Sequence, residues 1–160
     1  MPKITPRRAA AFRRFITTLP KGKDTELVLL KGHLLIEEQV RALIDHRLRN
    51  PDVLREANSR FDTHKAIQLA RAFFPPDHLL GVWDSVLKLN KLRNDIAHNL
   101  WPKSALADKI DSWVKTAPVN LQGIDEPEAR FEMTLWILFE AISNLVDAPS
   151  AKVVKFDAPT

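Results

Sequence analysis

Prolines divide the apolar pattern of this chain into stretches with helical spacing. They stand at positions 51, 75, 76, 102 and 127, among others. A proline ends or kinks a helix because it lacks the amide hydrogen and its ring clashes with the preceding turn. Between these breaks, apolar residues recur every three or four positions, and no stretch alternates as a β-strand does. The four glycines are too few for tight-turned β architectures. The sequence therefore predicts an all-α fold.

We expect a bundle of about five to six helices. Their expected ranges are 5–19, 24–49, 62–74, 77–99, 104–115 and 127–147. Thr5 suits the N-cap position of the first helix, Asp24 or Thr25 caps the second, and Asp62 or Thr63 begins the third. A chain of 160 residues is long enough for one domain and short for two. We therefore predict a single helical domain over 1–147 and a flexible C-terminal tail over 148–160.

The composition excludes several classes of function. The chain has no cysteine, which excludes disulfides and thiol catalysis. It has no apolar run of the length that a membrane helix needs, no glycine-rich phosphate motif and no G-x-S-x-G turn. Its five histidines never stand four residues apart, as paired metal ligands on a helix would. We expect no metal, no cofactor and no membrane contact, and we expect the protein to be cytoplasmic.

The charged residues on the first two helices have either a structural or solvated role or a functional one. The first helix carries Arg7, Arg8, Arg13 and Arg14 on one side. They form either a solvated face or a contact to nucleic-acid phosphates, and the net charge of +4 points weakly to a polyanion. His33, Glu37 and Glu38 lie near the apolar face of the second helix. They are interpreted as solvated or structural, with support of a nearby site by Glu37 or Glu38 as the alternative.

The helix expected over 77–99 carries a polar cluster in its last turns. Asn90, Arg93, Asn94 and His98 continue an arc that is apolar farther upstream. At 100° per residue, Arg93 and His98 lie about 140° apart around the helix. If both act on one group, either the helix frays near Trp101 or a second copy of the chain supplies one of them. A second apolar arc is formed by Val82, Leu89, Leu92 and Ile96.

The segment Arg93-Asn94-Asp95-Ile96-Ala97-His98 resembles the signature of the HEPN superfamily. These are small α-helical domains that include many prokaryotic ribonuclease toxins and defence proteins. Their signature is an arginine, a polar residue and then a histidine after four to six intervening residues, late in the bundle. The leading Leu89-Asn90-Lys91-Leu92 is also similar. In detail the resemblance covers about ten residues, and the order of the helices extends it loosely over 24–147.

The resemblance implies a metal-independent endoribonuclease that acts as a homodimer. In that reaction the RNA 2′-hydroxyl attacks the adjacent phosphorus and leaves a 2′,3′-cyclic phosphate. Histidine can transfer the protons near neutral pH, and arginine holds phosphate oxygens with its planar fork. Arg93, His98 and Asn94 are the expected catalytic residues, and Lys88 and Lys91 the expected RNA contacts. The second apolar arc is the expected dimer contact. A role as a toxin or phage-defence effector would imply a cognate antitoxin, either nucleotidyltransferase-like or DNA-binding.

Two other interpretations remain open. The first is a non-catalytic helical module of the same fold that binds nucleotides or proteins in a regulatory role. The second is a helical scaffold in which Arg93 and His98 only brace the bundle. Arg41 and His46 have the same spacing as Arg93 and His98, but Ala42 follows Arg41 and their surroundings are those of an ordinary amphipathic helix. We interpret that pair as structural.

Overall fold

The computed structural model describes residues 4–20, 24–56 and 61–149, and these residues form helices without any strand. The helices are α1 (Pro6–Thr18), α2 (Thr25–Arg47), α3 (Val53–Glu56), α4 (Thr63–Ala72), α5 (Leu80–His98), α6 (Lys103–Thr116) and α7 (Pro127–Asp147). Six of them have ten residues or more, and α3 is a single turn. The all-α prediction is confirmed.

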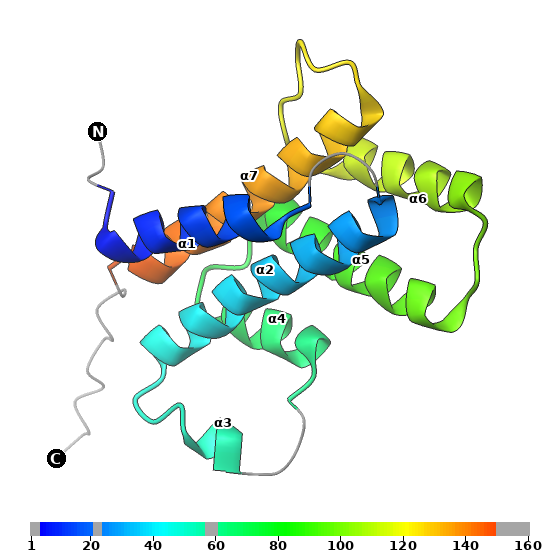
Figure 1. Cartoon of the computed structure of the whole chain (residues 1–160). Coiled ribbons are helices and arrows are strands. Elements are labelled where there is room, and N and C mark those ends of the chain that lie inside the picture. The colour runs from blue at the N-terminus through cyan, green and yellow to red at the C-terminus, as the bar shows by residue number, and fades with distance from the viewer. Residues whose placement is uncertain (1–3, 21–23, 57–60, 150–160) are drawn as a thin grey trace, which may run out of the picture.

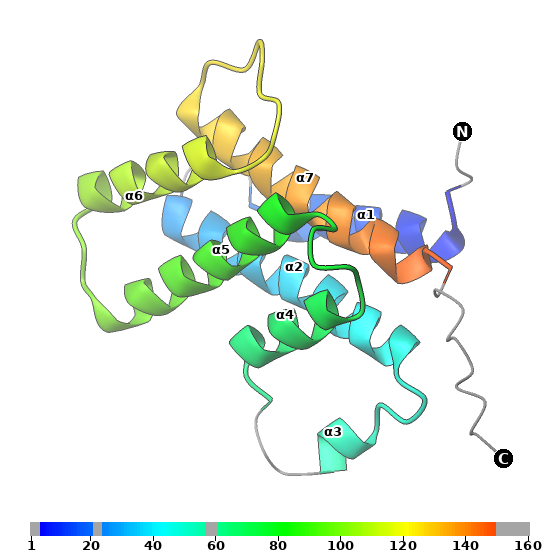
Figure 2. The ribbon, with the colours of Figure 1, turned by 180° about the vertical axis from the view of Figure 1, so that it is seen from behind.

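Helices α2 and α7 pack along each other at the centre of the molecule (Figure 1). Helix α1 lies on α7, while α4 and α5 pack against α2. Seen from behind, α5 lies between α4 and α6 (Figure 2). One side of α5 therefore meets α4 and the other meets α6. None of the described helices combines the length and the apolar character needed to cross a membrane.

The contact between α2 and α7 depends on a glycine. A Cβ atom at Gly32 would lie 2.6 Å from Cδ1 of Leu135, which is closer than side-chain atoms approach one another. Leu135 is fully buried, so the glycine allows the two helix backbones to come close. The aromatic rings of Phe15, Trp136 and Phe139 fill the space between α1 and α7. The prediction that the last helix is central is confirmed by its contacts to four other helices.

Side-chain caps begin three of the helices. Thr5, Asp24 and Asp62 each accept a hydrogen bond from the backbone N–H three residues later. Such caps satisfy amide groups that have no partner within the helix. The sequence predicted Thr5 for α1, and the structure selects Asp24 over Thr25 for α2 and Asp62 over Thr63 for α4.

The helix bounds differ from the expected ranges at several ends. Helix α5 begins at Leu80 rather than at 77, because residues 76–79 form a turn in which Leu79 takes a left-handed conformation with φ of 51°. Helix α2 ends at Arg47 and α4 at Ala72, each two residues earlier than expected. The single turn α3 lies between two of the expected ranges, and residues 57–60 lie outside the described part. The expected tail also lies outside it from residue 150 onwards.

Three of the four arginines of α1 pair with carboxylates on other helices. Arg7 donates from Nε to Oδ1 of Asp147 at 2.7 Å, and Arg8 pairs with Glu140 of the same helix α7. Arg14 pairs with Glu38 on α2 at 2.5 Å. The hydrogen bond from Arg7 lowers the pKa of Asp147. Arg7 and Arg8 are therefore held by carboxylates of α7 and do not form a free basic face. Arg14 remains exposed, so its interpretation as solvated or phosphate-binding stays a prediction.

Candidate functional site

Helix α5 remains regular through both residues of the arginine–histidine pair. It runs from Leu80 to His98, and Asn99 closes it by donating from Nδ2 to the carbonyl of Asp95 at 2.8 Å. The helix therefore does not fray between Arg93 and His98. Both side chains are exposed, but they lie about 7.5 Å apart along the axis and about 140° apart around it. Within one chain they do not face the same point.

The second apolar arc of α5 is not free to form a dimer contact. Val82, Leu89 and Leu92 are buried, and Ile96 packs against the same core. Trp83 and Val86, which lie upstream on the arc that ends in the polar cluster, are buried as well. Both arcs are covered because α5 is enclosed by α4 and α2 on one side and by α6 and α7 on the other. The expected place of the dimer contact is therefore wrong, and a contact between copies would need another surface.

Arg93 and Asn94 line an open pocket between α5, α4 and the C-terminal half of α2. Its lining residues are Arg41, Phe61, Asp62, Thr63, His64, Lys65, Asn90, Arg93 and Asn94. The pocket has a volume of about 610 Å³, which is in the range of small-molecule and nucleotide sites. Three lining side chains are cationic and one is a carboxylate. The pocket is therefore suited to an anion.

Arg93 is the cation of this pocket that no carboxylate holds. Its Nη1 donates to Oδ1 of Asn94 at 3.0 Å. Among the described residues it has no ion pair, whereas Arg41 pairs with Glu37 at 2.7 Å and Lys65 with Asp62 at 3.7 Å. A guanidinium that is exposed and unpaired keeps its donors available for phosphate oxygens. The pairing with Asn94 fixes the direction in which it points.

A buried hydrogen bond between His33 and Asn90 lies behind the wall of this pocket and forms a polar link between two helices. Nε2 of His33 on α2 lies 2.9 Å from Oδ1 of Asn90 on α5, and both side chains are buried. Nδ1 of His33 lies 3.9 Å from Oε2 of Glu37, which in turn accepts from Arg41. Arg41 also donates to the carbonyl of Phe61 at 3.0 Å. The link thus connects α2 with α5 and with the segment that leads into α4.

Asn90 uses only its oxygen for this link. No described residue accepts a hydrogen bond from its Nδ2 group, although the side chain is 4% exposed and lines the pocket. An amide donor that lines a pocket without an acceptor from the protein is suited to an acceptor on a ligand. The sequence placed Asn90 in the polar cluster but did not indicate its buried partner His33.

Burial lowers the pKa of His33 below the ordinary histidine value. The hydrogen bond to Asn90 and the charge of Glu37 act in the opposite direction, and the charge of Arg93 adds to the lowering. The unfolded chain therefore takes up a proton at a higher pH than the folded chain does. The free energy of unfolding therefore has no contribution from protonation of His33 above about pH 6.5, and it decreases as the pH falls below that value, because the unfolded chain then binds the proton more tightly.

We expect the His33→Gln variant to show a weaker dependence of stability on pH. Below about pH 6.5 the free energy of unfolding of the wild type should fall more steeply, by up to about 1.4 kcal/mol per pH unit. Urea unfolding at a series of pH values measures both slopes. His46→Gln is the matched control, because His46 is exposed. Equal slopes in wild type and His33→Gln would contradict the assignment of a buried neutral histidine.

The expected RNA contacts Lys88 and Lys91 lie on a different side of α5. They are exposed and line a shallow groove between α5 and α6 together with Lys109 and Asp95. Lys91 pairs with Asp95 at 3.0 Å, and Nζ of Lys109 lies 4.4 Å from the centre of the Trp101 ring. This groove is separate from the Arg93 pocket, so the structure does not bring these lysines to the same place as Arg93 and Asn94.

His98 stands at the C-terminal end of α5 outside both depressions. It lines neither the Arg93 pocket nor the lysine groove. Leu100 follows two residues later and is a fully exposed large apolar side chain. Residues 98–100 are therefore exposed and include one large apolar side chain.

The second Arg–His pair has a structural explanation. Arg41 is engaged by Glu37 and by the Phe61 carbonyl, and Nδ1 of His46 lies 2.9 Å from the carbonyl of Ala42. The interpretation of this pair as structural is therefore supported, although Arg41 also contributes to the wall of the Arg93 pocket.

Sequence reasoning missed the contribution of α4 to the site. Thr63, His64 and Lys65 come from its first turn and line the pocket opposite α5. In the sequence, His64 was visible only as a histidine two residues after the N-cap Asp62. The sequence does not show how α4 and α5 pack against each other. It therefore could not predict that His64 shares a pocket with Arg93.

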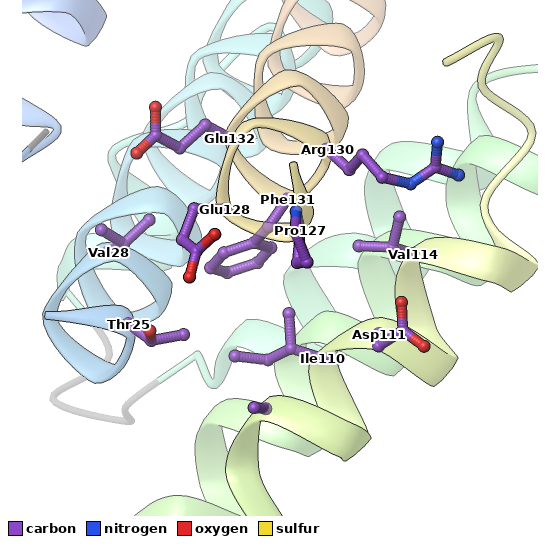
Figure 3. Close-up of a pocket in the computed structure, with 11 residues that line it drawn as sticks. Thr25, Val28, Ile110, Asp111, Val114, Pro127, Glu128, Arg130, Phe131 and Glu132 are labelled. Atoms are coloured by element: carbon purple, nitrogen blue, oxygen red, sulfur yellow. The ribbon is translucent and has the colours of Figure 1, made fainter. Parts of the chain in front are cut away.

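A second pocket lies away from these residues, between α2, α6 and α7. Figure 3 shows Phe131 and Ile110 at its centre, with charged side chains such as Glu128 and Asp111 at the rim. Its volume of about 60 Å³ is too small for a nucleotide. None of the catalytic or RNA-binding residues expected from the sequence lines it. Among the described residues, no group of three or more potential ligands could hold a metal ion.

Comparisons with known proteins did not identify relatives of this chain. No family model, no curated protein and no solved structure matches it.

Proposed function

We propose that this protein is a metal-independent endoribonuclease of the HEPN type. The observation that carries the proposal is Arg93, a guanidinium with no ion pair among the described residues, in a pocket whose lining is cationic overall. It has Asn94 beside it, the buried amide Asn90 in the same wall, and His98 farther along the same helix. An arginine and amide donors suit a phosphodiester, and a histidine supplies the proton transfer that its cleavage requires. The resemblance of residues 89–98 to the HEPN signature supports the same reaction.

The proposed enzyme is a homodimer in which each site takes residues from both chains. Because α5 is a regular helix, Arg93 and His98 of one chain lie about 140° apart around its axis and cannot face the same phosphate. A two-fold axis near the end of α5 would bring the His98 of one copy toward the Arg93 of the other. Leu100 is exposed and follows His98 by two residues in the chain, so such a contact would be expected to bury it. This surface replaces the second apolar arc as the proposed interface.

The roles of the residues follow from their chemistry. Arg93 would hold the nonbridging phosphate oxygens and stabilise the charge that builds up on the phosphorane. Asn94 would fix the direction of the guanidinium, and His98 would exchange a proton with a ribose oxygen. The groove of Lys88, Lys91 and Lys109 would contact the RNA backbone beyond the cleaved bond. A toxin or defence role with an antitoxin partner would follow if this cleavage acts on cellular RNA.

A second candidate function is a non-catalytic module that binds nucleotides or acidic segments of a protein. The observation in its favour is that the pocket of a single chain contains Arg93, Asn94 and Asn90 but not His98. A pocket with cationic and amide donors binds an anionic ligand whether or not it cleaves it. The two candidates predict the same binding and differ in turnover.

The deciding experiment is cleavage of labelled RNA by the purified protein in the presence of EDTA. We expect products that end in a 2′,3′-cyclic phosphate and a free 5′-hydroxyl. Folded Arg93→Ala and His98→Ala variants should each lose cleavage by about 10²–10⁴-fold. Arg41→Ala would break an ion pair, so His46→Ala is the cleaner control and should keep wild-type activity. Binding of RNA without cleavage of tRNA, mRNA or rRNA would favour the non-catalytic module.

A further inference from the structure

His64 lies on the wall of the Arg93 pocket that α5 does not form. It is the second residue of α4, directly after Thr63, and it lines the pocket together with Arg93, Asn94 and Asn90. The ion pair of Arg71 with Asp84, at 3.7 Å, joins α4 and α5 near their connecting turn. The first turn of α4 then lies opposite the later turns of α5. His64 and Arg93 therefore approach one cavity from two different helices.

The side chain of His64 has no structural task that explains its position. It is exposed, and among the described residues no hydrogen bond or ion pair holds it. The charged groups that line the same pocket are Asp62 and Lys65 on its own segment, Arg41 on α2 and Arg93 on α5. Asp62 caps α4 and pairs with Lys65. The bond from the Lys65 backbone lowers the pKa of Asp62 most, and the charge of His64 lowers it less. The imidazole is free to exchange a proton with a ligand in the pocket.

We propose that His64 is the second proton-transfer group of the ribonuclease site and acts in the same chain as Arg93. This inference rests on the proposed function and names the acid–base partner that His98 needs. Cleavage requires two proton transfers at opposite sides of the phosphorus, because the attacking 2′-oxygen and the leaving 5′-oxygen are in line. Arg93 and Asn94 occupy the α5 wall, so a group on the α4 wall has access to an oxygen that they do not contact.

The proton balance is complete with two histidines and no further reactant. A neutral histidine takes the proton of the 2′-hydroxyl while the bond from O2′ to phosphorus forms. The bond from phosphorus to O5′ breaks, and the other histidine, which is protonated, gives its proton to O5′. The products are the cyclic phosphate and the 5′-hydroxyl, and the two histidines have exchanged protonation states. His64 from one chain and His98 from its partner would form this pair.

The test is the pH profile of RNA cleavage by His64→Gln, with His46→Gln as the matched control. We expect cleavage to fall by about 10²–10⁴-fold while the affinity for RNA stays unchanged, because glutamine can keep polar contacts but cannot transfer the proton. The wild-type profile should be bell-shaped, and His64→Gln should lose one of its two limbs. His46→Gln should behave as the wild type.

Two outcomes would overturn the assignment of His64 alone. They are full activity of His64→Gln, and reduced activity with both limbs of the pH profile retained. In either case, loss of cleavage in Arg93→Ala and His98→Ala would leave the ribonuclease proposal in place. If the wild type itself does not cleave RNA, the proposed function fails and the assignment of His64 fails with it.

Discussion

A mixture of Arg93→Ala and His98→Ala chains is expected to regain RNA cleavage that neither variant has alone. Because α5 is regular through His98, each proposed site combines Arg93 of one copy with His98 of the other. In a mixed dimer one of the two sites loses both residues and the other keeps both. Random exchange makes about half of the dimers mixed, so about a quarter of the wild-type activity should return. The starting variants are each expected to be impaired by about 10²–10⁴-fold.

The measurement is the cleavage rate after mixing, with mixed dimers purified by two different affinity tags. Mixing Arg93→Ala with His64→Gln is the matched control, because both residues belong to the same chain's pocket and one lesion then remains in each site. That mixture should stay inactive. Restoration in the control, or its absence in purified Arg93→Ala and His98→Ala mixed dimers, would contradict this division of the site between the chains.

The sequence predicted the helices well because their signals are local. Proline breaks, N-caps such as Thr5 and Asp62, and the spacing of apolar residues depend only on near neighbours in the chain. The start of α5 was misplaced by three residues, because the left-handed turn at Leu79 is not encoded by a glycine or an asparagine.

The site was only partly predictable, because some of its residues come together only through the packing of distant helices. Arg93, Asn94 and His98 stand close together in sequence, so a motif could single them out. His64 and the buried partner His33 come from other helices, and their positions depend on how α2, α4 and α5 pack. The arc of Val82 and Leu89 was assigned to a dimer because a sequence does not show how many sides of a helix its own chain will cover.

Replacement of Trp83 by alanine is expected to remove a large share of the stability of the fold. Trp83 is fully buried on α5, and its ring approaches that of Phe74 with centroids 6.3 Å apart. Removing a buried tryptophan side chain typically costs about 3–5 kcal/mol, against about 5–15 kcal/mol for a whole domain. Because the residue lies on the helix that carries Arg93, the loss should also loosen the pocket. Chemical denaturation monitored by circular dichroism measures the change.

A comparison of two phenylalanine variants separates packing from hydrogen bonding at this tryptophan. Nε1 of Trp83 is buried without an acceptor among the described residues, whereas Nε1 of Trp113 donates to the carbonyl of Ser85 at 3.0 Å. Trp83→Phe removes an unsatisfied donor, which offsets part of the lost packing, while Trp113→Phe removes a hydrogen bond as well. Trp113→Phe should therefore be more destabilising than Trp83→Phe by about 1–2 kcal/mol. Equal losses would contradict this difference in hydrogen bonding, because both side chains are buried and both changes remove the same atoms.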